Sequence, residues 1–160
     1  MAASVPLRRL EPPRAAPSGA ARFYAWAPAV AWAALIFVMS TDKLSAEHTR
    51  IWIEPVVRFV LPRLSAHAFA IFHTALRKFA HLGEYAVFSW LLERALRLES
   101  PVPAAHAPIV ALAVAMLYSL TDEAHQWFVA SRGASWADCV RDTIGGAIGA
   151  EIARRRRSVR

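Results

Sequence analysis

Several acidic side chains lie inside segments of this sequence that are otherwise apolar. Glu84, Asp122, Glu123 and Asp142 each interrupt a run of mostly hydrophobic residues. A carboxylate in such surroundings is energetically expensive unless it faces a partner, so these positions are candidates for a functional site. Their oxygens can accept hydrogen bonds from hydroxyl groups or amines, and one of them could act as a general base beside His81.

Further polar residues fall on the same helical faces as these acids. At 100° per residue, an arc of about 120° holds the group Lys78, His81, Glu84 and Tyr85. A narrower arc holds Asp122, Glu123 and Gln126, and one stripe on a later helix holds Asp138, Asp142, Gly145 and Gly149. The predicted polar cluster consists of Lys78, His81, Glu84, Tyr85, Asp122, Glu123, Gln126, Arg132, Asp138 and Asp142.

Two other interpretations of these residues remain open. In a structural role, Lys78, His81 and Arg132 would neutralise the acids and lock helices together without any chemistry. In a metal site, His81 and Glu84 would be joined by ligands from residues 122–125. We expect neither a metal nor a cofactor, because His125 points away from Asp122 on the helical wheel and no HExxH motif is present.

The remaining histidines and the single cysteine do not suggest a site. His48, His67, His73 and His106 are expected to be ordinary surface or interfacial histidines. Cys139 excludes a disulfide framework and is expected to pack as a small apolar residue.

The apolar segments themselves predict an all-α, polytopic membrane protein. Hydrophobic residues make up 56 % of the chain and charged residues 19 %, against about 25 % charged residues in ordinary soluble domains. Residues 23–41 carry no charge and would form a helix of about 28 Å, close to the thickness of the hydrocarbon layer. A second uncharged run covers residues 100–121, and two interrupted candidates cover residues 79–96 and 136–153. We expect a bundle of about four transmembrane helices, with an uncleaved first span rather than a signal peptide.

The connection between the first two spans predicts amphipathic helical structure. Glu54 and Arg58 form an i,i+4 pair on one side of a helical wheel, and Trp52 and Phe59 lie on the other. We expect this helix to begin at Glu54, with Pro55 in its first turn and Pro62 beyond its end. It would lie at the membrane interface or pack as an ordinary surface helix. Ser65 is positioned to cap a further helix that runs into Lys78.

The distribution of charge predicts the orientation of the spans. With four spans, the side that contains both chain ends holds eleven cations and four acids, a surplus that equals the net charge of +7. This side is therefore expected to be cytoplasmic, and the Arg154–Arg157 run would contact anionic lipid rather than nucleic acid. The expected organisation is a disordered basic tail over residues 1–22, a transmembrane domain over residues 23–153, and a basic tail over residues 154–160. Glu84, Asp122 and Asp142 would then share one level, about 9 Å below the outer boundary.

Several ordered motifs resemble the VanZ-like family of bacterial membrane proteins. They are Met39-Ser-Thr-Asp-Lys43, Arg77-Lys-Phe-Ala-His81, Gly83-Glu-Tyr85, Thr121-Asp-Glu-Ala-His-Gln126, and Ser131-Arg-Gly-Ala-Ser135 followed by Asp138 and Asp142-Thr-Ile-Gly145. The resemblance covers about residues 30–150. It implies a small multi-span helical protein of the bacterial inner membrane and an association with resistance to teicoplanin, but no defined chemistry.

Together these observations favour a membrane factor without enzymatic activity. We expect the cluster to face the outer surface, to bind a lipid headgroup or a cell-wall precursor, and to influence glycopeptide susceptibility. The alternatives are an intramembrane enzyme that acts on a lipid-linked substrate, and a purely structural membrane subunit. No nucleic-acid partner is expected, and the sequence leaves the oligomeric state open.

Overall fold

The protein is built from helices connected by short segments. The computed structural model describes residues 18–41, 46–128 and 135–158, and these contain five helices and no strands. The helices are α1 (Gly19–Met39), α2 (Ala46–Val60), α3 (Ala66–Glu99), α4 (Ala107–Trp127) and α5 (Trp136–Ser158). The prediction of an all-α fold is therefore confirmed.

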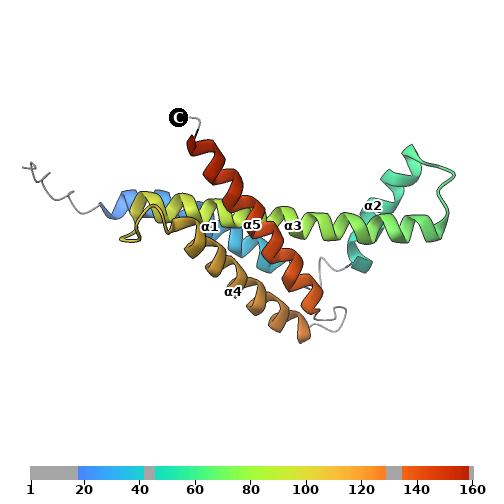
Figure 1. Cartoon of the computed structure of the whole chain (residues 1–160). Helices are drawn as coiled ribbons and strands as arrows, with labels where there is room; N and C mark the ends of the chain where they lie inside the picture. The colour runs from blue at the N-terminus through green and yellow to red at the C-terminus, as the bar shows by residue number, and fades with distance from the viewer. Residues whose placement is uncertain (1–17, 42–45, 129–134, 159–160) are drawn as a thin grey trace, which may run out of the picture.

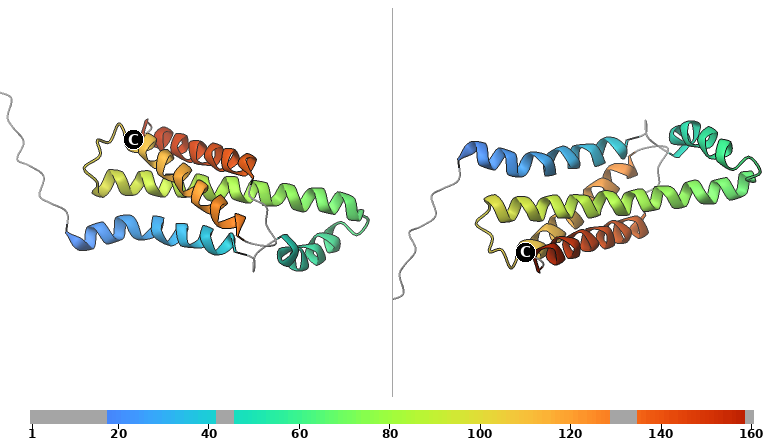
Figure 2. Two further views of the ribbon diagram at one scale, coloured as in Figure 1. Left: turned by 90° about the horizontal axis from the view of Figure 1, so that it is seen from below. Right: turned by 90° about the horizontal axis from the view of Figure 1, so that it is seen from above.

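Helix α3 is the axis of the molecule. Helices α1, α4 and α5 pack around its C-terminal part, and α2 lies beside its N-terminal part, away from the others (Figures 1 and 2). The two views of Figure 2 place α1 on one side of α3 and α5 on the other. The C-terminal ends of α1 and α4 and the start of α5 meet near the middle of α3 (Figure 2).

Helix α3 is longer than the sequence suggested. The structure joins the helix expected after Ser65 and the span expected over residues 79–96 into one helix of 34 residues. Ser65 is its N-cap as predicted, and its Oγ accepts a hydrogen bond from the Ala68 backbone N–H at 3.2 Å. No proline occurs between Ala66 and Glu99 to break it. At 1.5 Å per residue the helix is about 51 Å long, well beyond a hydrocarbon layer of about 30 Å.

Other helix boundaries also differ from the prediction. Helix α1 begins at Gly19, inside the segment expected to be a disordered tail, because Ser18 caps it through a hydrogen bond from Ala21 N–H. Helix α5 continues through residue 154 to Ser158, into the expected C-terminal tail. The rest of the predicted N-terminal tail lies outside the described residues.

Prolines explain two further differences. Helix α4 begins at Ala107 rather than near residue 100, with Pro108 in its first turn and the earlier prolines in the preceding loop. Helix α2 begins at Ala46, so Pro55 lies inside the helix rather than in its first turn. The predicted ion pair of α2 is present, with Arg58 Nη2 2.7 Å from Glu54 Oε1.

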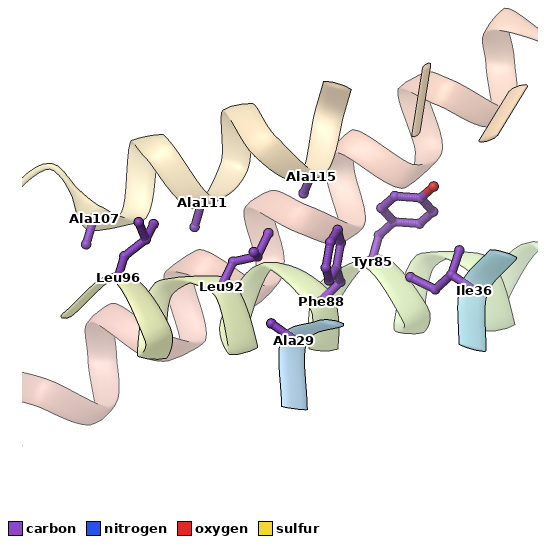
Figure 3. Packing of buried hydrophobic residues seen from close by; sticks show 9 residues of the cluster. All are labelled: Ala29, Ile36, Tyr85, Phe88, Leu92, Leu96, Ala107, Ala111 and Ala115. Atoms are coloured by element: carbon purple, nitrogen blue, oxygen red, sulfur yellow. The ribbon is translucent and has the colours of Figure 1, made fainter. Parts of the chain in front are cut away.

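The hydrophobic core is a layered contact between α1, α3 and α4. Its buried residues are Ala29, Ile36, Tyr85, Phe88, Leu92, Leu96, Ala107, Ala111 and Ala115 (Figure 3). The three alanines of α4 recur every four residues, which places them on one face opposite the large side chains of α3. Small residues on one helix and large ones on the other let the two helices interdigitate.

Two of the helices are long and apolar enough to cross a membrane. These are α1 (Gly19–Met39) and α4 (Ala107–Trp127). Helices α3 and α5 are long enough to cross a membrane, but they contain no stretch as apolar as those of α1 and α4. The helical content predicted from the sequence is thus confirmed, whereas the arrangement as four spans is not.

Candidate functional site

Asp122 forms the first centre of the polar cluster. Its side chain is 3 % exposed, near the C-terminal end of α4. Its Oδ2 accepts a hydrogen bond from Ser40 Oγ at 2.8 Å and another from Gln126 Nε2 at 2.9 Å. Because Ser40 is the C-cap of α1, this carboxylate joins the ends of two helices.

Asp142 forms the second centre, where α3, α4 and α5 meet. It is completely buried, and its Oδ2 accepts a hydrogen bond from Ser119 Oγ of α4 at 2.9 Å. Its Oδ1 lies 3.7 Å from Nδ1 of His81 on α3. Tyr85 is also completely buried, and its hydroxyl group is within electrostatic range of Asp122 and Asp142 without a hydrogen-bond partner among the described residues. Three helices therefore contribute side chains to one buried polar centre.

Glu123 lies beside this centre and lines a pocket. Its Oε2 accepts a hydrogen bond from the Ser135 backbone N–H at 2.8 Å, just before α5 begins. The pocket has a volume of about 210 Å³ and lies between the end of α4 and the start of α5. Its wall consists of Leu120, Glu123, Ala124, Trp127, Ser135, Trp136 and Cys139. It is an apolar recess with a carboxylate in its wall and two tryptophans beside it.

The rim of the cluster contains the charged groups. Asp138 forms an ion pair with Arg141 on its own helix. The Arg77 guanidinium interacts electrostatically with Asp138 and with Glu84. Glu84 is half-buried, and its backbone carbonyl oxygen accepts a hydrogen bond from Trp32 Nε1 of α1 at 2.9 Å.

Two residues of the predicted polar cluster are not found among the residues of the buried centre, the pocket or the rim. Lys78 is exposed, whereas the neighbouring Arg77 is partly buried and within electrostatic range of Asp138 and Glu84, since successive side chains on a helix point about 100° apart. Arg132 lies outside the described residues. The other eight predicted residues lie in the buried centre, at the pocket or on the rim.

Sequence reasoning missed three contributors, Ser40, Ser119 and Arg77. Ser119 precedes Asp122 by three residues and Gln126 by seven, so helical spacing alone places it on their face. Arg77 precedes His81 by four residues and Glu84 by seven, which is the same signal. No periodicity indicates Ser40, because its role depends on where α1 ends relative to α4.

Two glycines of α5 allow the helices to meet at this point. A Cβ atom at Gly145 would clash with the backbone carbonyl oxygen of Leu82, and one at Gly149 with that of Ala86. The predicted small-residue face of Gly145 and Gly149 is therefore in contact with the backbone of α3. This close approach brings Asp142 of α5 next to His81.

The donor set of the cluster suits hydrogen bonding and proton transfer. Among the described residues, no three histidine, cysteine, aspartate or glutamate side chains come close enough together to hold a metal ion. The metal site considered for His81, Glu84 and residues 122–125 is thus not assembled by the described side chains. Carboxylates, hydroxyls, an amide and an imidazole can bind hydroxyl or amine groups, or exchange a proton with them.

The expectation that His73 is an ordinary surface or interfacial histidine is wrong. It is 6 % exposed because α2 covers it, and its ring stacks on Phe69 with centroids 5.8 Å apart. The ring nitrogen Nε2 lies 3.4 Å from Thr49 Oγ1 of α2. This histidine belongs to the contact between α2 and α3 rather than to the polar cluster.

Comparison with known proteins gives one match. No curated protein and no solved structure matches the chain. The family model described as VanZ/LLP1 matches residues 25–157, which include α2, α3, α4, most of α1 and nearly all of α5. With that match over most of its length, this chain belongs to the VanZ/LLP1 family.

Proposed function

We propose that this chain is a four-span membrane protein in which α3 and α5 cross the bilayer together with α1 and α4. The distribution of side chains on α5 supports this. Val140, Ile144, Ile148 and Ile152 recur every four residues and are 41–60 % exposed, so they form an outward apolar stripe. Asp142 and the glycines are on the buried side of the same helix. The carboxylate in the middle of this helix is therefore turned away from lipid.

The proposed orientation places both chain ends in the cytoplasm. It is supported by the cationic surplus on that side, which favours the cytoplasmic face by the positive-inside rule. In a bacterial inner membrane the cluster around Asp122 and Asp142 then lies within the outer leaflet. The N-terminal third of α3, together with α2, extends beyond the bilayer on the outer side.

We infer that the cluster binds the polar part of a membrane lipid or of a lipid-linked cell-wall precursor. The observation that carries this inference is the recess of about 210 Å³ beside Glu123, next to the buried centre around Asp122. Its carboxylate can accept hydrogen bonds from an amine or hydroxyl group, while its tryptophans offer apolar and aromatic surface. By binding and shielding this polar group, the protein would change the access of teicoplanin-type glycopeptides to the outer surface of the cytoplasmic membrane.

Isosteric substitutions test this function. Asp122→Asn, Glu123→Gln and Asp142→Asn remove charge while keeping shape, and each is expected to shift teicoplanin susceptibility at least fourfold in a sensitive bacterial host. We would measure the minimal inhibitory concentration together with the amount of protein in the membrane. Glu151→Gln is the matched control, because it removes a carboxylate from the opposite end of α5.

The outcomes separate the three classes of function. Changed susceptibility at unchanged abundance supports binding by the cluster. Reduced abundance for the three variants but not for Glu151→Gln indicates a structural subunit. Unchanged susceptibility at unchanged abundance contradicts the proposed function.

A second candidate function is an intramembrane enzyme. It is favoured by the approach of His81 Nδ1 to Asp142 Oδ1 at 3.7 Å, which places an imidazole beside a buried carboxylate, a pair suited to proton exchange. An enzyme of this kind would change the lipid composition of cells that overproduce the protein, and His81→Gln would abolish that change. Identical lipid profiles with and without the protein contradict it.

A further inference from the structure

A second recess lies between α3 and α5, farther toward the C-terminal ends of both helices than the polar cluster. Its volume is about 230 Å³, and its wall consists of Ala86, Val87, Trp90, Gly149, Ile152 and Arg156. It opens where α5, after its closest approach to α3 at Gly149, diverges from that helix toward its C-terminal end (Figure 1). The result is an apolar groove on the outside of the bundle with one cation at its end.

Arg156 differs from Arg154 and Arg155 in its ion pairing. Arg154 and Arg155 both bind Glu151, with Nε to carboxylate distances of 2.7 Å in each case. Arg156 has no acidic partner among the described residues, and its side chain is exposed. The groove therefore ends at a guanidinium that is not neutralised within the described part of the chain.

We propose that this groove binds an anionic phospholipid of the inner leaflet. One acyl chain would lie against Val87, Trp90 and Ile152, and the phosphate would bind Arg156. A guanidinium binds phosphate oxygens with two parallel hydrogen bonds, and a basic site between helices on the cytoplasmic side is suited to anionic headgroups. The proposal rests on the membrane orientation given under Proposed function, but not on any role of the outer cluster.

The geometry of α5 supports this occupant. Arg156 follows Gly149 by seven residues, which is about 10 Å along the helix axis. The groove thus runs from the interior of the proposed span toward its cytoplasmic end, where a phospholipid has its phosphate. Ile152 lies between the two, on the exposed apolar stripe of α5.

Lipid binding to the purified full-length protein tests the proposal. The probes are dioleoyl phosphatidylglycerol, zwitterionic dioleoyl phosphatidylcholine and inorganic phosphate, with retained lipids counted by native mass spectrometry. Arg156→Gln should weaken retention of phosphatidylglycerol about fivefold, the loss expected for one cation at an anionic surface. Arg155→Gln is the matched control, because its guanidinium is already paired with Glu151, and it should change retention less than twofold.

A second variant tests the acyl chain separately from the charge. Ile152→Trp fills the groove at an exposed position, and it should also weaken phosphatidylglycerol retention while leaving the melting temperature unchanged. Equal losses for Arg156→Gln and Arg155→Gln would show a nonspecific effect of charge and overturn the proposal. Full retention by Ile152→Trp, or displacement of the lipid by inorganic phosphate, would overturn it as well.

These results are independent of the outer cluster. Arg156→Gln should leave teicoplanin susceptibility as it is in the unmodified protein, because Arg156 is not part of the cluster around Asp122 and Asp142. A failure of the lipid site therefore leaves the proposed function standing, and the reverse also holds.

Discussion

Hydrogen bonds within and between helices hold one carboxylate oxygen of each buried aspartate, and the other oxygen of each has no hydrogen-bond partner among the described residues. Asp122 and Asp142 accept their hydrogen bonds from Ser40, Gln126 and Ser119, which carry no charge. A hydrogen bond to a charged group contributes about 1.5–3 kcal/mol, and an unsatisfied buried group is costly. The two acids thus link the C-terminal ends of α1 and α4 to the N-terminal part of α5, and they provide hydrogen-bonding groups that apolar packing would lack.

His73 offers a pH-dependent test at the scale of one residue. It lies outside the predicted spans, and burial, together with the nearby Arg77 and Arg50, lowers its pKa below the ordinary value of 6.5. Because the imidazole binds a proton less readily when α2 covers it, the docked state of α2 loses stability as the pH falls below about 6.5. We expect faster amide hydrogen exchange in α2 at pH 5.5 than at pH 7.5, after correction for the intrinsic exchange rate.

Two histidine variants control this experiment. His73→Gln should remove the pH dependence of exchange in α2, since no imidazole is left to titrate there. His67→Gln, at an exposed position near the start of the same helix, should leave it intact. If α2 responds to pH equally in both variants, His73 is not the responsible group.

At the scale of helices, the approach of α5 to α3 depends on glycine. Gly149→Ala would force the new Cβ atom against the Ala86 carbonyl oxygen, and overpacking of this kind typically costs about 1–3 kcal/mol. Gly83→Ala is the matched control on α3, because a Cβ atom there has nothing within 4 Å. Since alanine favours a helix over glycine by up to about 1 kcal/mol, this variant should be more stable than the original protein.

Thermal unfolding of the detergent-solubilised protein measures both effects. The melting temperature should fall for Gly149→Ala and rise slightly for Gly83→Ala. A melting temperature for Gly149→Ala as high as that of Gly83→Ala would show that α3 and α5 separate there without cost, and would contradict the tight contact.

The sequence predicted those features of the helices that depend on residue type and spacing within a single segment. Helical periodicity placed Asp122 with Gln126 and Asp142 with the glycine face, and Ser65 was recognised as a cap by its residue type and position. Helix lengths were less predictable, because proline occurs both inside α2 at Pro55 and before the start of α4. Local sequence signals do not distinguish a proline that a helix tolerates from one that ends it.

Contacts that depend on the register between helices could not be predicted. The hydrogen bond from Ser40 to Asp122 needs the end of α1 to lie level with the last turn but one of α4. The hydrogen bond from Tyr118 Oη to the Ala33 carbonyl oxygen, at 2.7 Å, has the same requirement. The position of one helix along another is set by packing, as in the alanine face of α4 against Leu92 and Leu96. The sequence of a single segment contains no signal for it.

For the molecule as a whole, apolar surface is distributed as expected for a protein surrounded by lipid. Large hydrophobic side chains are exposed on every helix, including Phe23 on α1, Leu117 on α4 and Val140 on α5. Buried positions, by contrast, include aspartates, a glutamine and several serines. Helix α2 is exposed on its apolar side, where Trp52 is 79 % and Phe59 89 % exposed, which favours the interfacial interpretation of this helix.

The orientation of the whole molecule can be tested with two positions at opposite ends of α3. Arg63 lies in the segment before the helix and position 105 in the loop after it, and both are exposed. In a Cys139→Ser background, Arg63→Cys should react with a membrane-impermeant maleimide in intact cells. Ala105→Cys should react only after permeabilisation, because the cationic side of the protein is expected to face the cytoplasm. Labelling of both positions in intact cells would contradict a membrane-spanning α3, and labelling of position 105 alone would invert the proposed orientation.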